Sequence, residues 1–251
     1  MYHGQMIPNA KYWARYFREF HVRAIEGFRA GALEKVATAF GGIEEEAERA
    51  AEAEFERLGS MPADDGIDMG DVAEWAQEHG IQYYETMSGV RQGVLNLLAV
   101  GLHHLFEQQQ LFFLRRELAR DDEGALRVAE LERRLARLGI DCRSFRSADK
   151  LYELWKAANA IKHGAGPAAK ELAALRPDLF ENPVLAKYGL RNGVLGSGRA
   201  AVLASSLSAP LAGDDLYISE RDLADWCAAV VDYWEELSTM LDEQHRRQVA
   251  G

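Results

Sequence analysis

The chain has 251 residues, of which 48% are hydrophobic, and a formal net charge of −11 at pH 7. This length and composition suit one large domain or one domain with an appendage, and they exclude a largely disordered protein. The longest nearly apolar run, residues 94–102, is much shorter than the about 20 residues of a transmembrane helix, so no membrane span is expected.

The N-terminal residues show neither the basic start nor the apolar core of a secretory signal, which predicts a cytoplasmic protein. The two cysteines, Cys142 and Cys227, lie far apart and form no C-x-x-C pattern. This usage fits a reducing compartment and supplies no framework for a metal ion. We therefore expect no metal and no cofactor.

Charge is distributed unevenly along the chain. Residues 41–90 carry fourteen Asp and Glu against two Arg, whereas residues 141–200 carry ten Lys and Arg against six acids. The acidic total argues against nucleic-acid binding, because contact with a phosphate backbone needs clustered Lys and Arg. The basic segment can nevertheless face a polyanion, or it can pair with the acidic segment.

Apolar residues recur three and four positions apart through most of the chain, which predicts an all-α fold. Residues 9–40 form an aromatic-rich helical arm, glycines interrupt it, and residues 43–58 resume as an amphipathic helix. Pro, Gly and Asp between residues 59 and 71 indicate a linker. The predicted organisation is an N-terminal extension (1–60), a linker (61–71) and a helical bundle domain (72–251).

The bundle domain is expected to contain several helices of different length. Proline at a first helical position and a Ser-x-x-Asp capping box mark two of the helix starts. The predicted helices span residues 72 to about 120, a segment ending at Gly139, Ser147 to His163, Pro167 to Leu175, and a closing helix after Ser219 with Asp222 in its cap. Residues 176–215 are expected to be mostly loop.

The helix predicted for residues 147–163 carries the main candidate site. At 100° per residue its apolar arc consists of Leu151, Leu154, Trp155, Ala158 and Ile161. The polar stripe beside this arc consists of Tyr152, Lys156, Asn159 and His163. A histidine in this stripe suits acid–base chemistry near neutral pH. The alternative is a basic last turn that complements the helix dipole in front of the capping residue Gly164.

The stretch ANAIKH, residues 158–163, resembles the motif of the HEPN superfamily, helical bundles whose ribonuclease members carry Arg, four to six residues and then His. Asn159 and His163 match this motif, but Ala158 stands where the arginine should be. NLLAVGLHHLFEQQQ and GDDLYISERDLADWCAAVVDYWEEL are similar to two helices of uncharacterised bacterial HEPN-like proteins. The resemblance covers roughly residues 80–245.

The resemblance implies a HEPN-like bundle of four to five core helices with an N-terminal helical extension, and a homodimer in which two copies form one cleft. It also implies metal-independent RNA cleavage, with His163 as acid or base, Asn159 as a positioning residue and Lys156 as a weak substitute for the missing arginine. The supporting residues would be His104, Glu107 and Lys162, and the RNA contacts would be Arg143, Arg146, Arg191 and Arg199. His104 is expected to face into the bundle, within reach of His163.

An alternative function is a catalytically inactive HEPN-like scaffold or regulatory partner that acts through protein–protein contacts. Ala158 and the acidic residues 41–90 favour it, and the N-terminal arm would serve dimerisation. The nuclease or RNA-binding protein would belong to a bacterial stress or phage-defence system, and the possible partners are RNA and a cognate protein. The HHLFEQ stretch lacks the second copy that a di-metal bundle needs, and the G-x-G-x-x-A stretch near Gly196 lacks a βαβ context.

Overall fold

The computed structural model describes residues 7–61, 68–120, 124, 126–164, 166–183 and 216–250. All regular structure in these ranges is helical, which confirms the all-α prediction. The N-terminal elements are α1 (Ala10–Tyr16), the π-helical η1 (Phe17–Val22), α2 (Arg23–Ala30), the π-helical η2 (Gly31–Val36), the 3₁₀ turn η3 (Ala37–Phe40) and α3 (Ile43–Gly59). The later elements are α4 (Met69–Phe113), η4 (Leu114–Leu118), α5 (Val128–Arg137), η5 (Cys142–Ser144), α6 (Ala148–His163), α7 (Pro167–Leu175), η6 (Pro177–Phe180) and α10 (Glu220–Ala250).

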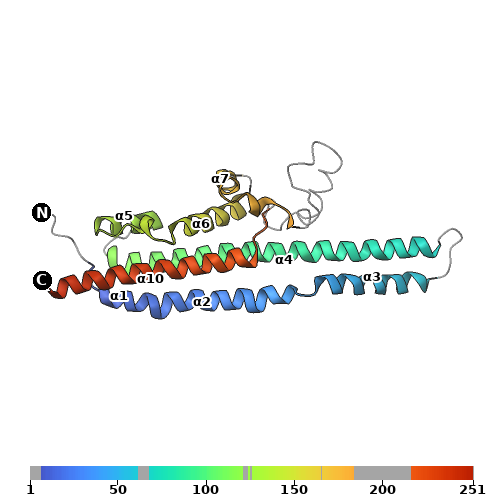
Figure 1. Ribbon diagram of the computed structural model, residues 1–251, viewed down its shortest axis with the longest axis horizontal. Coiled ribbons are helices and arrows are strands. Elements are labelled where there is room, and N and C mark those ends of the chain that lie inside the picture. The colour runs from blue at the N-terminus through green and yellow to red at the C-terminus, as the bar shows by residue number, and fades with distance from the viewer. Residues whose placement is uncertain are drawn as a thin grey trace.

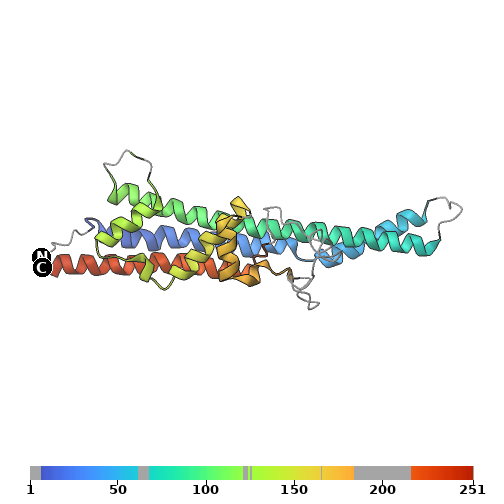
Figure 2. The same cartoon turned by 90° about the horizontal axis from the view of Figure 1, so that it is seen from above.

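The helices form an elongated bundle (Figures 1 and 2). The run from α1 to α2 lies beside α10 and the C-terminal half of α4, while α6 packs on both α4 and α10. Helix α3 continues the direction of α1 and α2, and α4 turns back along it, so that α3 and the N-terminal half of α4 extend beyond α10 as a two-helix unit. We call α3 and residues 69–88 of α4 the distal arm. Within the part of the chain that the structure describes, no helix has both the length and the apolar character needed to cross a membrane.

Local sequence signals set several of the helix ends. Gly42, with φ of 87°, separates α3 from the preceding helical run, as expected from the two glycines there. At the start of α10 the amide of Asp222 donates to Ser219 Oγ at 3.1 Å, and the amide of Ser219 donates to Asp222 Oδ2 at 3.0 Å. The predicted capping box is therefore confirmed. An unpredicted second one, between Asp68 and Asp71, starts α4.

Close approach of small residues holds the distal arm together. A Cβ atom on Gly80 of α4 would lie 2.8 Å from the carbonyl oxygen of Ala47 and 2.9 Å from the Cβ of Ala51, both on α3. Because any larger side chain would collide with the α3 backbone, Gly80 fixes the distance between the two helices. Residues 62–67, within the predicted linker, lie outside the described residues.

The N-terminal extension contributes to the same hydrophobic core as the bundle domain. Trp13, Phe17 and Ile25 are almost completely buried in one cluster with Leu102 of α4 and Trp234 of α10. This burial explains the wide aromatic face seen in the sequence, because the run from α1 to α2 packs against more than one helix.

His21 is buried at the centre of this aromatic core. Its ring lies 4.4 Å from that of Trp234 and stacks on Phe17 at 5.2 Å, and its Nδ1 atom has no hydrogen-bond partner. The Gln109 side chain forms hydrogen bonds with both neighbours. It accepts one from the Trp234 indole N–H at 2.7 Å and donates one to the carbonyl oxygen of His21 at 3.2 Å. Burial lowers the pKa of His21 to about 4, so the ring is neutral at pH 7.

A stability change in acid follows from His21. The unfolded chain takes up a proton near pH 6.5, whereas the folded protein takes it up only near pH 4, so stability is lost as the pH falls through this window. The loss from this residue is about 3 kcal/mol. His21→Leu should remove that part of the decline when unfolding by urea is followed from pH 7 to pH 4. An unchanged decline would contradict the assignment, and the exposed His104→Leu is the control.

Candidate functional site

Ala158, the position where the HEPN motif has its arginine, is completely buried in the bundle. It lies on the side of α6 that packs with α4 and α10, together with the buried residues Leu154 and Ile161. An arginine at this position would therefore point into the core and not toward solvent. The alanine is what the packing of α6 requires.

Lys156 is held by neighbouring side chains. Its ammonium forms an ion pair with Glu171 of α7 and lies 4.2 Å from the ring centroid of Trp155 and 5.1 Å from that of Tyr152. The hydrogen bond to Glu171 raises the pKa of Lys156, and Tyr152 donates to the same carboxylate at 3.1 Å. The lysine therefore joins α6 to α7, and a phosphate would have to compete with Glu171 for it.

The remaining motif residues lie at the exposed end of α6. The Asn159 side chain donates from Nδ2 to the carbonyl oxygen of Trp155 at 2.8 Å, so it bonds to its own helix. His163 and Lys162 are exposed in the last turn. Gly164 follows with φ of 63°, and its amide donates to Ala160 at 2.9 Å. The basic last turn with a glycine cap, one of the two interpretations of this stretch, is the geometry observed.

The prediction that His104 faces into the bundle is wrong, because His103 is buried and His104 is exposed. The face of α4 that carries His104 lies largely on the surface, and Leu97 on this face is 58% exposed. Successive residues on a helix differ by 100°, so the choice between adjacent histidines depended on which α4 face was assigned to the core. Glu107 approaches His103 instead, with 3.5 Å between Oε2 and Nδ1.

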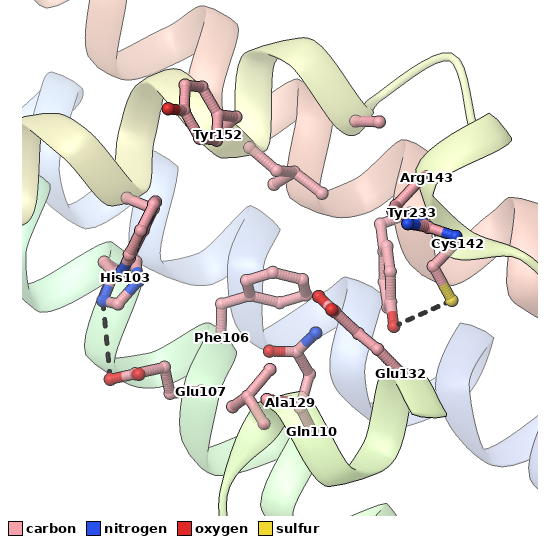
Figure 3. A pocket seen from close by; sticks show the side chains of 14 residues that line it. His103, Phe106, Glu107, Gln110, Ala129, Glu132, Cys142, Arg143, Tyr152 and Tyr233 are labelled. Carbon is pink, nitrogen blue, oxygen red and sulfur yellow. Dashed lines mark hydrogen bonds and ion pairs between the residues drawn. The ribbon is translucent and has the colours of Figure 1, made fainter. Parts of the chain in front are cut away.

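His103 and Glu107 form one end of the main pocket of the described structure (Figure 3), which has a volume of about 520 Å³. Helices α4, α5, α6 and α10 and the η5 turn surround it. Its aromatic lining consists of Phe106, Tyr152, Trp155 and Tyr233, and its polar lining consists of His103, Glu107, Gln110, Glu132, Cys142 and Arg143. Of the sequence-predicted site residues that the structure describes, Glu107 and Arg143 alone line this pocket.

The pocket lining holds three groups with shifted pKa values, and burial is the largest cause for each: it raises the pKa of Tyr233 and acts on His103 and Cys142 as follows. Burial lowers the pKa of His103, and the neighbouring Glu107 carboxylate opposes this effect only in part. The Nδ1 atom of His103 makes no hydrogen bond although the side chain is only 9% exposed. Burial raises the pKa of Cys142 to about 11, and its Sγ lies 3.7 Å from the Tyr233 hydroxyl. At pH 7 the cysteine is therefore a thiol and not a nucleophilic thiolate.

Two of the four predicted RNA-binding arginines, Arg143 and Arg146, lie among the described residues, and each has an acidic neighbour. Arg143 donates from Nε to Asp141 at 3.1 Å, and Arg146 lies 3.9 Å from Glu236. Both side chains remain largely exposed, at 82% and 80%. Arg191 and Arg199 lie outside the described residues, as does the G-x-G-x-x-A stretch.

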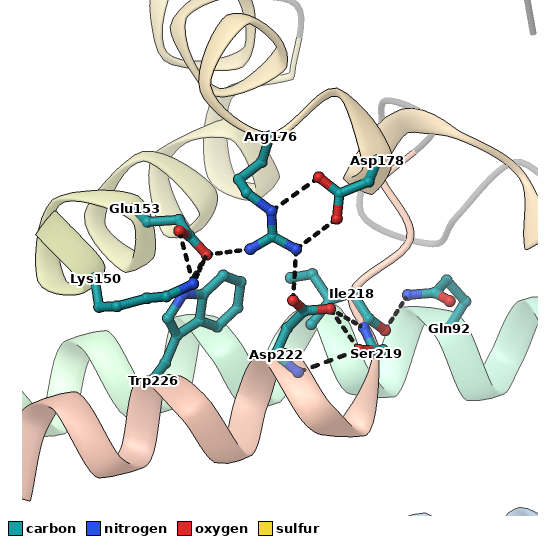
Figure 4. A network of polar contacts seen from close by, with 9 residues as sticks. All are labelled: Gln92, Lys150, Glu153, Arg176, Asp178, Ile218, Ser219, Asp222 and Trp226. Atoms are coloured by element: carbon teal, nitrogen blue, oxygen red, sulfur yellow. Dashed lines mark hydrogen bonds and ion pairs between the residues drawn. The ribbon is translucent and has the colours of Figure 1, made fainter.

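Sequence reasoning missed a buried ionic network around Arg176 (Figure 4). Arg176 pairs with Glu153 of α6, with Asp222 of α10 at 2.7 Å and with Asp178 at 2.6 Å. The buried Glu153 also accepts from Trp226 Nε1 at 3.0 Å and pairs with Lys150 at 3.1 Å. This network ties α6, η6 and α10 together at one point.

Two carboxylates of this network, Asp178 and Asp222, have lowered pKa values. Burial alone would raise the pKa of Asp222, but hydrogen bonds from Ser219 and Arg176 outweigh burial and lower it. The hydrogen bond to Asp178 raises the pKa of Arg176 further above its ordinary value. In the sequence Arg176 precedes a proline in a predicted loop, so no local pattern pointed to its partners.

No known family, curated protein or solved structure matches this chain. Among the described residues, no group of three or more His, Cys, Asp and Glu side chains is arranged to hold a metal ion. Its function is therefore inferred from the contacts within the chain itself.

Proposed function

We propose that this protein is a catalytically inactive, HEPN-like helical scaffold that acts through protein–protein contacts, its first partner being a second copy of itself. The burial of Ala158 is the observation that carries the inactive part of the proposal. Lys156 is paired to Glu171 and Asn159 is bonded to its own helix, so neither of these two residues is free to take over the arginine's role in stabilising phosphorane charge.

An exposed aromatic surface supports the homodimer. Tyr12, Phe20 and Phe112 are 59%, 56% and 39% exposed, and Tyr16 lies between them. The Tyr16 ring stacks on Phe20 at 4.7 Å and on Phe112 at 5.7 Å, which joins α1, η1 and α4 into one surface. We call these four residues the aromatic stripe. Contiguous exposed aromatic rings are typical of interaction surfaces.

Charges beside the aromatic stripe suit a second copy of the chain. Arg116 lies 5.8 Å from the ring centroid of Phe112, and Arg15 pairs with Glu19 at 2.8 Å. A two-fold axis brings the same patch of both copies together, so a patch with both signs of charge can be complementary to itself. The distal arm is a poorer self-association surface, because acidic residues dominate α3 and like charges repel.

The aromatic stripe can be tested by sedimentation velocity. The wild type should be a dimer at micromolar concentration, and Phe20→Ser with Phe112→Ser should weaken it at least about a hundredfold, since burying each ring contributes about 1.5–3 kcal/mol. Trp75→Ser with Ile81→Ser, which removes two exposed apolar residues of the distal arm, should leave the dimer intact. A monomeric wild type, or a dimer broken only by the arm variant, would refute the proposed surface.

RNA cleavage is the second candidate function, and the exposure of His163 and Lys162 in the last turn of α6 favours it. A histidine in solvent can exchange protons with a bound ribose hydroxyl. One assay of RNA cleavage with EDTA present distinguishes the nuclease from the inactive scaffold. Cleavage that disappears in His163→Ala would overturn the inactive scaffold, and equal inertness of both proteins at high concentration would support it.

A further inference from the structure

The pocket between α4, α5, α6 and α10 is not explained by a scaffold function. Its volume of about 520 Å³ lies within the about 300–1,000 Å³ typical of small-molecule sites. Phe106 and Tyr233 form part of the aromatic lining from α4 and α10, while Tyr152 and Trp155 contribute from α6. Flat apolar surfaces from three helices favour a ligand with a flat apolar body.

The polar groups in the pocket indicate the charge of that ligand. Glu107 from α4 and Glu132 from α5 bring two carboxylates to it, and Figure 3 shows Glu132 directed toward Phe106 and Gln110. Arg143 is the one arginine in the lining, and its guanidinium is already paired with Asp141. The carboxylates therefore outweigh the available positive charge, and aromatic rings add to the attraction for a cation.

His103 supplies a ring nitrogen, Nδ1, that makes no hydrogen bond in the described structure and lies 3.5 Å from Glu107 Oε2. The His103 side chain is only 9% exposed, and its Nδ1 atom has no hydrogen bond. Buried polar atoms are paired in most native proteins, so an unpaired one at a pocket wall indicates a missing partner. A ligand N–H group at the pocket wall, beside both His103 and Glu107, would supply that hydrogen bond.

We propose that this pocket binds a small organic cation, an amine carried on a flat apolar or aromatic body, with the ammonium group between Glu107 and Glu132 and the body against the aromatic wall. This site is independent of the aromatic stripe, whose residues do not line the pocket.

The charge requirement can be tested with three indole ligands of similar size: tryptamine as the cation, tryptophol as the neutral molecule and indole-3-acetate as the anion. Isothermal titration calorimetry on the full chain at pH 7 should give tightest binding for tryptamine, by about tenfold or more over tryptophol, because hydrogen bonds to charged groups contribute about 1.5–3 kcal/mol. Equal affinities for the three ligands would overturn the cation assignment. Absence of binding by all three at millimolar concentration would overturn the site.

Matched variants test whether the indole ligands bind in this pocket. Glu132→Gln should weaken tryptamine binding about tenfold while leaving tryptophol binding unchanged, since only the charge is removed. Ala129→Phe, at an exposed lining position, should abolish binding of all ligands by filling the pocket without disturbing the core. Glu56→Gln on the distal arm is the control. Tryptamine binding that survives in Ala129→Phe with its far-ultraviolet circular dichroism intact would refute the site, whatever the oligomeric state of the protein.

Discussion

Replacing Arg176 with methionine is expected to lower the free energy of unfolding by about 3–5 kcal/mol, the cost of leaving a buried charge without its partner. Glu153 is 5% exposed and would retain Lys150 and the Trp226 indole N–H as its only contacts in this network. Asp222 would lose the same guanidinium. Equilibrium unfolding in urea, followed by circular dichroism, measures the change.

A second substitution and a control make this prediction specific. Glu153→Gln keeps an acceptor for Trp226 but removes the charge, so the double variant with Arg176→Met should recover part of the lost stability. Arg18→Met also removes an arginine that pairs with two carboxylates of α10, but those side chains are 37–45% exposed. It should cost no more than about 1 kcal/mol. Equal losses for Arg176→Met and Arg18→Met would contradict the role given to burial.

Restoring the motif arginine with Ala158→Arg should destabilise the protein strongly and should not create a ribonuclease. Ala158 is completely buried on α6, so the new guanidinium would have to sit in the core or force α6 away from α4 and α10. Overpacking alone costs about 1–3 kcal/mol, and an unpaired buried charge adds to this. The expected result is a drop of at least about 3 kcal/mol in unfolding free energy, or a failure to fold.

An exposed alanine gives the comparison for this substitution. Ala53→Arg makes the same chemical change on the surface of α3 and should alter stability by no more than about 0.5 kcal/mol. RNA cleavage in EDTA is measured on the folded variants. A stable Ala158→Arg protein that cleaves RNA, and loses that activity when His163 is also replaced, would show that the arginine reaches solvent and that the site is a damaged nuclease.

Helix boundaries were predictable because the relevant signals are local. Pro167 at the first position of α7 and the Ser219–Asp222 capping box at α10 each act within one turn, and the structure places both helices where the sequence predicts them. The helix predicted for residues 147–163 also ends at His163, as expected. These features depend on backbone groups that the neighbouring side chains satisfy or terminate.

The candidate site was less predictable, because it depends on which helix face meets which neighbour. The apolar arc assigned to α6 included Trp155, which is 43% exposed and lines the pocket, whereas Lys156 in the polar stripe is largely buried by its contacts. The choice of His104 over His103 failed for the same reason. Periodicity gives the angle between side chains but not the direction in which the whole helix is turned.

The Arg176 network could not be predicted at all. Its partners Glu153 and Asp222 are 23 and 46 residues away in the sequence, so only the assembled fold brings them together. A single charged residue in a predicted loop is ordinarily a solvated one. The four groups that meet here are recognisable only once α6, η6 and α10 are in place.

The distal arm has a consequence for the order in which the chain folds. Its two helices pack on each other and follow one another along the chain, so the contact between Gly80 and Ala47 closes a loop of modest length. The core around Trp234, by contrast, must join the first helix of the chain to the last. Contacts between nearby residues lose less chain entropy and form sooner than distant ones. The distal arm is thus expected to form its contacts earlier than the core around Trp234 does.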